Sequence, residues 1–214
     1  MIFNLSSQNT IGNQFISELR DKDIQLDRPR FRRNMKRLGQ LMAYEISKKL
    51  HFKNEVIQTP MGQCNVQVLS RQPVLLTVMR AGLPYFDGFL EFFDQSDCGF
   101  IGAYRQEDTE KLVIHLDYVA TPHVDGREVI VVDPMLATGK SFVRSIEALL
   151  KHGTPSHIYV ACLVAAPEGI KYVKENLTTP FSIYTCAVDE NLNHQFYIVP
   201  GLGDAGDLSF GLKL

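Results

Sequence analysis

The sequence has no tryptophan and only four cysteines among its 214 residues. The cysteines are Cys64, Cys98, Cys162 and Cys186. They form no C-x-x-C pair, so we interpret them as small core hydrophobes rather than as metal ligands or a redox pair. The six histidines show neither H-x-H nor H-E-x-x-H spacing, and a zinc site is therefore unsupported.

An excess of one charge and long hydrophobic runs are also lacking. The chain carries 22 Lys+Arg against 24 Asp+Glu, and its 45% hydrophobic residues are typical of a globular protein rather than a disordered chain or a polyelectrolyte for nucleic acid. The runs VLLTVM and VIVV are far shorter than the about 20 residues of a membrane span. The first ten residues, MIFNLSSQNT, do not resemble a secretory signal, and we expect a cytoplasmic protein.

Without repeats or low-complexity segments, a chain of 214 residues predicts one large domain or a domain with an arm. Residues 1–30 are polar and irregular in pattern, and we predict that they form an N-terminal arm. Residues 31–214 are predicted to form a single domain. Its first element is an amphipathic helix over residues 31–50, where apolar residues recur near helical spacing. A turn at residues 60–62 and a strand around 65–69 are predicted to follow.

From residue 73 onward, short apolar runs alternate with stretches of helical pattern. The predicted strands are 74–79, 129–132, 158–164 and 183–188, and the predicted helices are 85–93, 141–152 and 168–176. This order predicts an α/β fold with a central, mostly parallel sheet flanked by helices. Small or polar residues follow three strands, at 80–82, 133–141 and 165–169. Ligands bind at the carboxyl ends of such strands, so these loops should share one crevice.

The most informative of these loops is in IVVDPMLATGKS, residues 130–141. Free N–H groups at the start of a helix near Ser141 would face a phosphate, and Thr138 and Ser141 add hydroxyl groups. Asp133, at the strand end, has the chemistry to accept hydrogen bonds from sugar hydroxyls or to approach a metal. The alternative is a plain strand-to-helix turn with Ser141 as the N-cap.

Two motif matches fail in their context. Residues 138–141, TGKS, match the end of a P-loop, but Pro134 stands where its first glycine belongs. Residues 201–206, GLGDAG, match G-x-G-x-x-G, but only eight residues follow, too few for a dinucleotide-binding unit. This loop still places Asp204 and Asp207 among small residues, which lets backbone approach a flat ligand closely. The alternative is a glycine-rich terminal turn.

Arginines provide the remaining candidates. Arg80 and Arg105 each follow an apolar segment, and the arginine fork matches phosphate oxygens, so both are candidates to hold a pyrophosphate. Taken singly, each arginine is more typical of a surface ion-pair partner. The basic cluster between Arg28 and Arg37 leads into the first predicted helix, and we interpret it as a solvated or interface-facing helix start rather than a nucleic-acid site.

Five strings, taken in order, resemble the uracil phosphoribosyltransferases of the type I phosphoribosyltransferase superfamily. They are VMRAGLP, FIGAYRQEDT, VVDPMLATGKS, LVAAPEGI and YIVPGLGDAGD, and the resemblance runs from about residue 31 to the C-terminus. It implies the type I phosphoribosyltransferase fold, with a hood over about 106–122 and a base-binding loop over about 197–211. It implies transfer of phosphoribosyl from 5-phosphoribosyl 1-pyrophosphate to uracil, giving UMP and pyrophosphate in pyrimidine salvage, with Mg²⁺ held mainly by the pyrophosphate and water.

The resemblance also implies roles for individual residues. The implied catalytic residues are Arg105, Asp133 and Asp204. The implied donor-binding residues are Arg80, Arg105, Asp133, Pro134, Met135, Leu136, Ala137, Thr138, Gly139, Lys140, Ser141 and Asp204. The implied uracil-binding residues are Ile198, Gly203, Asp204 and Ala205, three of them through backbone groups. Family habit and the basic helix suggest a homodimer or larger homo-oligomer, and some members of the family have a purine-nucleotide activator.

The sequence departs from the family pattern in three segments. Lys140 stands where the family has a second glycine, residues 120–122 read Ala-Thr-Pro instead of Lys-Leu-Pro, and Leu208 replaces an arginine. The first change adds a cation beside the phosphate loop, and the second removes one from the hood. Two alternatives stay open: a sensor that binds the sugar donor or UMP with little turnover, and a transferase for another base. The uracil-type C-terminal loop argues against the latter.

Overall fold

The computed structural model describes residues 1–106 and 113–212, and the side chains of residues 103–116 lie outside that description. The strands are β1 (Ile2–Asn4), β2 (Phe52–Thr59), β3 (Gly62–Leu69), β4 (Val74–Met79), β5 (Cys98–Gln106), β6 (Val113–Ala120), β7 (Glu128–Val132), β8 (Met135–Leu136), β9 (His157–Ala165), β10 (Phe181–Val188), β11 (Asn191–Leu192) and β12 (Ile198–Val199). The helices are α1 (Ile11–Arg20), α2 (Arg28–Ser47), α3 (Leu83–Leu90), α4 (Lys140–Leu149), α5 (Pro167–Asn176) and α6 (Ala205–Phe210), with short 3-10 turns at Leu5–Ser7, Ile24–Leu26 and Leu150–His152.

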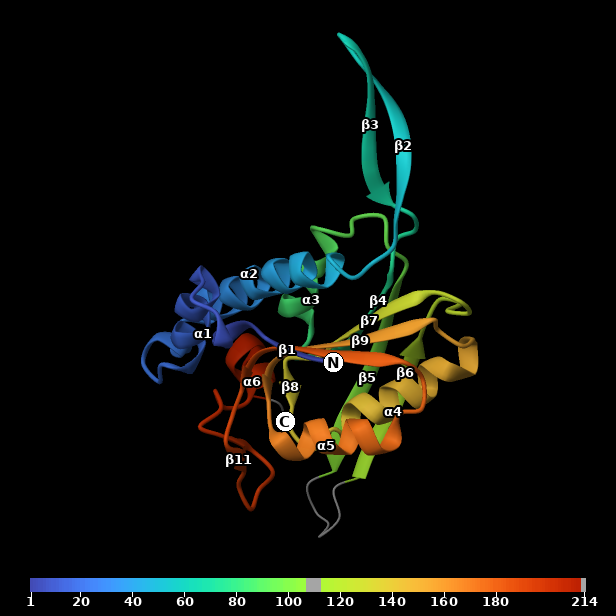
Figure 1. Cartoon of the computed structure of the whole chain (residues 1–214). Helices are drawn as coiled ribbons and strands as arrows, with labels where there is room; N and C mark the ends of the chain where they lie inside the picture. Colours follow the sequence, from blue (N-terminus) through green and yellow to red (C-terminus); the bar gives the residue numbers. More distant parts are fainter. Residues whose placement is uncertain (107–112, 213–214) are drawn as a thin grey trace.

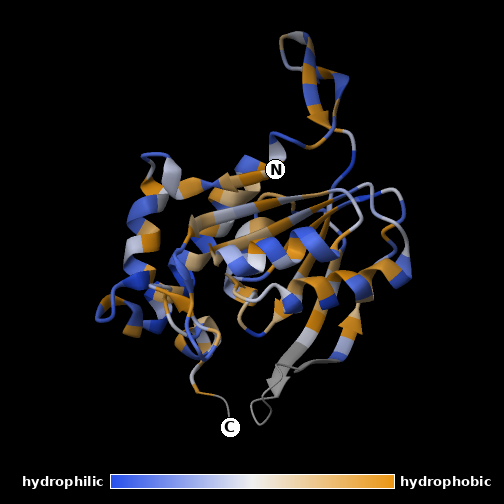
Figure 2. Ribbon diagram, turned by 60° about the horizontal axis from the view of Figure 1, so that its bottom comes forward, coloured by the Kyte–Doolittle hydropathy of each residue, from blue (hydrophilic) through white to orange (hydrophobic). Residues whose placement is uncertain are grey.

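The main sheet has the order β1-β10-β9-β7-β4-β5-β6, with β8 beside β9. Its described neighbours are parallel except β5 and β6. Helices α1, α2 and α3 cover one face, and α4 and α5 cover the other (Figure 1). Strands β4, β7 and β9 are buried almost throughout, as expected for parallel strands covered on both faces, and they appear largely orange in Figure 2. The predicted fold class is confirmed.

Residues 1–30 are more regular than their polar pattern indicated. Strand β1 extends the main sheet by pairing with β10, and α1 follows an N-cap at Thr10, whose side chain accepts the Gly12 N–H. Helix α2 begins at Arg28, three residues before the predicted start, because Asp27 caps it by accepting the Arg30 N–H at 3.1 Å. The irregular sequence pattern of residues 1–30 thus did not indicate this strand and helix. The division into an arm and a domain stays a prediction.

The cysteine interpretation holds for part of the set. Cys162 and Cys186 are buried in the sheet, as predicted, whereas Cys98 is half-buried. Cys64 is exposed, so the prediction was wrong there. It lies on β3, which pairs with β2 in a hairpin that projects from the body of the molecule (Figure 1). In the described part of the chain, no helix is long and apolar enough to cross a membrane.

A buried carboxylate joins α1 to α2. Glu18, whose side chain is 9% exposed, accepts hydrogen bonds from Arg30 Nε at 2.9 Å and Nη2 at 2.8 Å, from Asn34 at 2.6 Å and from Gln14 at 3.2 Å. These bonds, that of Arg30 foremost, lower the pKa of Glu18 from 4.5 to about 2 against the opposing effect of burial. Arg32 also donates to the Ser209 carbonyl at 2.6 Å. Arg30 and Arg32 therefore have partners within the chain, whereas Arg33 and Arg37 are exposed, as expected of a solvated helix start.

Replacing Glu18 with glutamine is expected to cost about 2 kcal/mol of unfolding free energy at pH 7, because the hydrogen bonds of a buried charged group are lost. A lowered folded-state pKa stabilises the fold above pH 4.5, and that contribution disappears as the pH falls from 4.5 towards 2. The unfolding free energies of wild type and variant, measured with denaturant, should therefore become equal as the pH is lowered. Glu175→Gln, at an exposed ion pair of 3.9 Å, is the control with little expected effect. A difference in unfolding free energy that does not change with pH would contradict this role of the Glu18 carboxylate.

Candidate active site

The loop after β7 has the geometry of an anion site. It leads into the 10-residue helix α4, whose N-cap is Gly139 at φ +78°, so the alternative with Ser141 as N-cap was wrong. A side chain at Gly139 would place its Cβ 2.7 Å from the Gly169 carbonyl oxygen, and only glycine combines this backbone with that contact. Asp133 Oδ1 accepts the Met135 N–H at 3.1 Å and fixes the start of the loop. Backbone amides at the positive end of α4 suit a phosphate.

The three predicted loops lie at one edge of the sheet. Strands β4, β7 and β9 are neighbours and run in the same direction, so their carboxyl ends meet. A Cβ at Gly82 would lie 3.2 Å from the Val132 carbonyl oxygen, and one at Gly169 would lie 2.3 Å from that of Ala137. Residues 80–82 and 165–169 therefore lie on the two sides of residues 133–141, and the crevice that the three loops are predicted to share stays a prediction.

Arg80 joins this edge to the C-terminal loop. Its Nη2 donates to Asp207 Oδ1 at 2.8 Å and to the Gly211 carbonyl oxygen at 3.1 Å, across 127 and 131 residues of sequence. Asp204 caps α6, because its Oδ1 accepts the N–H groups of Gly206 at 2.8 Å and Asp207 at 3.0 Å. A Cβ at Gly206 would lie 3.1 Å from Asp204 Oδ1 and 3.9 Å from Arg80 Nη2. The structure thus brings Arg80, Asp204 and Asp207 together.

The remaining predicted residues are placed less completely. The backbone of Arg105 pairs with Ile114 across β5 and β6, while its side chain lies outside the described part, as do residues 107–112 of the predicted hood. Ala120 pairs with Phe100 near the opposite end of these strands. Ala120, which stands where the family has a lysine, is therefore far along the β5–β6 pairing from residue 105.

The candidate uracil residues surround a tight turn. Ile198 and Ala205 are buried, and Gly203 adopts φ +90°. Gly201, at φ +62°, contacts two residues that the sequence reasoning missed: its N–H donates to Asp189 and its carbonyl oxygen accepts from Arg20. Asp189 follows β10 directly, as Asp133 follows β7, so the same strand-end pattern would have found it. Arg20 gave no such signal.

A cavity of about 370 Å³ lies beside α6 and the start of α2. Its lining consists of Gln25, Leu26, Asp27, Arg28, Pro29, Asp207 and Leu208. Leu208 thus lies in this wall where the family pattern has an arginine. Among the described residues, no three His, Cys, Asp or Glu side chains are grouped as a metal site.

Comparisons with known proteins agree with this geometry. The family model "Uracil phosphoribosyltransferase" matches residues 6–211. The chain is 42% identical to a uracil phosphoribosyltransferase of Porphyromonas gingivalis, covering 100% of this chain and 99% of the relative, and 37% identical to one from Methanothermobacter thermautotrophicus, covering 95% and 93%. The solved AQ2163 protein of Aquifex aeolicus superposes with a TM-score of 0.89, at 31% identity over both whole chains. The chain therefore belongs to the uracil phosphoribosyltransferase family.

Proposed function

We propose that the protein transfers the 5-phosphoribosyl group of 5-phosphoribosyl 1-pyrophosphate to uracil, forming UMP and pyrophosphate in pyrimidine salvage. Full-length similarity to relatives named uracil phosphoribosyltransferase is the observation that carries this function. The phosphate-type loop beside Arg80 and Asp204 supports it, because the sugar donor carries anionic groups at both ends of its ribose. No observation favours the sensor alternative.

The reaction breaks the bond between C1 of the ribose and the pyrophosphate oxygen and forms a bond from C1 to N1 of uracil. The pyrophosphate leaves with the electron pair, N1 loses its proton, and positive charge develops on the ribose ring. The chain's main tasks are therefore positioning and electrostatic stabilisation. We assign the 5-phosphate to residues 133–141, the pyrophosphate to Arg80 and Arg105, and the charged ribose to the carboxylates of Asp133 and Asp204.

The residues assigned to the sugar donor fit an Mg²⁺ ion that would enter with its pyrophosphate. Oδ1 of Asp204 is committed to the two N-cap hydrogen bonds, and Oδ2 is the oxygen with which this carboxylate would meet a cation. The ion would be held mainly by pyrophosphate and water, and it would neutralise the leaving group. Arg80 would hold the same anion from the protein side. Its present partner, Asp207, would then share the guanidinium with the pyrophosphate.

Uracil recognition is assigned to the backbone of Ile198, Gly203 and Ala205. Uracil presents two carbonyls and one N3–H, a pattern that amide and carbonyl groups complement. Cytosine replaces an acceptor with a donor and would leave groups unpaired, which is costly in a site that excludes water. The buried positions of Ile198 and Ala205, 5% and 2% exposed, support such a site.

The test is formation of UMP from labelled uracil, 5-phosphoribosyl 1-pyrophosphate and Mg²⁺. Cytosine, orotate and hypoxanthine serve as parallel substrates. The expected result is that uracil gives UMP and that none of the other three bases gives a product. Product from orotate or hypoxanthine would move the assignment to another base, and saturable binding of the donor without product would establish the sensor alternative.

Lys140→Gly is expected to raise the KM for the sugar donor about 10-fold, because the first residue of α4 would lose a cation beside the 5-phosphate. Lys140→Met, which keeps most of the bulk without the charge, should behave alike. Steady-state kinetics with varied donor measures both, with Lys151→Gly beyond the far end of α4 as the control. If the lysine instead obstructs the loop, Lys140→Gly lowers this KM and Lys140→Met does not.

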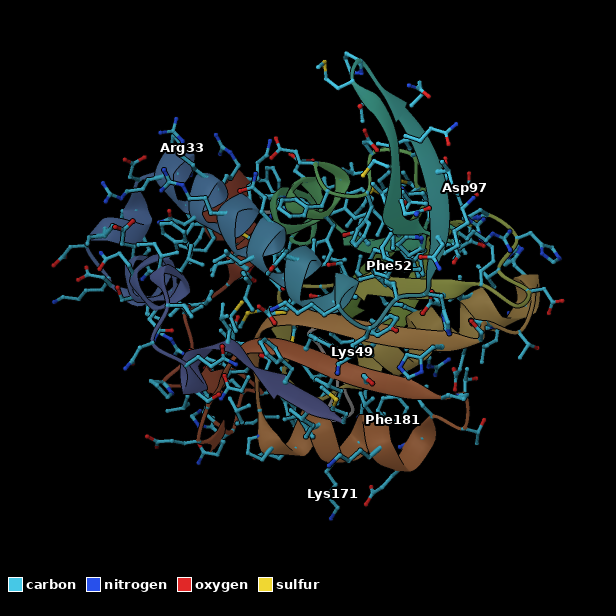
Figure 3. All side chains as sticks on the ribbon, turned by 45° about the horizontal axis from the view of Figure 1, so that its top comes forward. Arg33, Lys49, Phe52, Asp97, Lys171 and Phe181 are labelled. Atoms are coloured by element: carbon cyan, nitrogen blue, oxygen red, sulfur yellow. The ribbon has the colours of Figure 1, made fainter. Side chains whose placement is uncertain are left out.

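The projecting hairpin supports the proposed homo-oligomer. Strands β2 and β3 pair with each other alone in the described structure and project from the body (Figures 1 and 3). The hairpin exposes Phe52, Val56, Ile57 and Met61 by 40 to 96%. A lone two-stranded hairpin is marginal in water, so we expect it to pack against a second copy of the chain. Val56→Glu should shift the sedimentation coefficient from oligomer to monomer, whereas Gln63→Glu should not. A monomeric wild type would refute this. The cytoplasmic location and a purine-nucleotide activator stay predictions.

A further inference from the structure

The turn at Gly201 is held by an ion pair that links the N-terminal segment to the end of β10. Arg20 Nη2 donates to Asp189 Oδ1 at 2.6 Å, and Arg20 Nη1 donates to Asp189 Oδ2 at 2.9 Å. The same Nη1 donates to the Gly201 carbonyl oxygen at 3.0 Å, and the Gly201 N–H donates to Asp189 Oδ2 at 2.8 Å. Both polar groups of this one residue are therefore held by the pair.

Both members of the ion pair are held in place by their surroundings. Asp189 has a side chain that is only 5% exposed, and its N–H donates to the Ala165 carbonyl oxygen at the end of β9. Arg20 is the last residue of α1, where the negative end of the helix favours a cation, and its side chain is 23% exposed. Two nearly parallel hydrogen bonds fix the guanidinium plane against the carboxylate, a geometry that lysine cannot reproduce.

The turn has little freedom of its own. Gly201 adopts φ +62°, and a Cβ there would lie 2.1 Å from the Ile198 carbonyl oxygen. In the orientation of its amide that satisfies both partners, Gln25 donates to the Leu202 carbonyl oxygen at 2.8 Å. Two side chains of residues 1–30 thus contact consecutive residues of the turn. The turn lies between Ile198 and Gly203, the positions assigned to uracil.

We propose that Arg20 and Asp189 are positioning residues that set the backbone of the uracil-binding loop. This inference rests on the proposed function, in which backbone groups read the base. A loop read through its N–H and C=O groups has no side-chain rotamer to adjust, so its affinity for the base depends on where the backbone is held. The pair acts through Gly201 and touches neither substrate.

The variants are Arg20→Lys, which keeps the charge and loses the fork, and Arg20→Met with Asp189→Asn, which leaves no unpaired buried charge. In both, the KM for uracil should rise about 10-fold while the KM for the sugar donor changes by less than about 2-fold. Glu18→Gln is the matched control, because it loosens α1 from α2 without contacting the loop. It should lower stability and leave the KM for uracil unchanged.

Amide hydrogen exchange of residues 198–205 supplies a readout that needs no activity. Exchange should accelerate in both Arg20 variants and not in Glu18→Gln. Unchanged exchange, or equal rises in both KM values, overturns the positioning role. A wild type that forms no UMP refutes the proposed function instead, and the exchange data still decide whether the pair holds the loop.

Discussion

A Gly39→Ala variant is expected to lose about 3 kcal/mol of unfolding free energy, although alanine is the better helix former by about 1 kcal/mol. In α2, a Cβ at Gly39 would lie 2.2 Å from the Tyr85 carbonyl oxygen and 3.1 Å from the Cα of Gly88 in α3. A Cβ at Gly88 would in turn lie 2.2 Å from the Lys36 carbonyl oxygen. The helices meet backbone to backbone, so no side-chain rotation relieves the contact.

Urea unfolding of Gly39→Ala beside Arg33→Ala tests this expectation. Arg33 is an exposed residue of the same helix and projects away from the body (Figure 3), so its replacement should change stability by less than about 0.5 kcal/mol. A Gly39→Ala protein as stable as wild type would show that the two helices separate at little cost. Because α3 directly follows the Arg80 loop, a measurable separation should also weaken donor binding.

Strands β4, β7, β9 and β10 of the central sheet could be predicted from sequence because they are buried on both faces. Such strands are short continuous apolar runs, and β4 has the predicted bounds of 74–79. Helices α4 and α5 begin one residue before their predicted starts, within the uncertainty of any helix end. Arg80 lies beside residues 133–141 because both follow the ends of neighbouring parallel strands, and each strand end can be recognised from its own short stretch of sequence.

The features that the sequence did not predict are exposed strands without a regular apolar pattern and contacts between residues far apart in the chain. Strand β2 is exposed along nearly its whole length, and its sequence lacks the alternation of a half-buried strand, whereas β3 was predicted as a strand around 65–69. The Arg20 to Asp189 pair joins residues 169 positions apart, and nothing near Arg20 indicates its partner. The motif strings located Asp204 but did not reveal that it also caps α6.

The largest effect on activity is expected at Asp204. Asp204→Asn should lower kcat by about 100-fold or more, because the carboxylate assigned to the positively charged ribose and the cation would become neutral. Asparagine is as good an N-cap as aspartate, and its Oδ1 retains the acceptor for the Gly206 and Asp207 N–H groups. The unfolding free energy should therefore stay within about 0.5 kcal/mol of wild type.

Asp204→Ala separates the two roles of this residue. It removes the charge and also the cap, which costs about 1 kcal/mol and leaves two amides at the start of α6 without their acceptor. If the charge is what matters, both variants lose kcat alike, and only the alanine variant also loses stability and raises the KM for uracil. If Asp204 merely shapes the loop, asparagine restores most of the activity that alanine loses. Full kcat in Asp204→Asn would thus transfer the electrostatic role to Asp133, the other carboxylate assigned to the ribose.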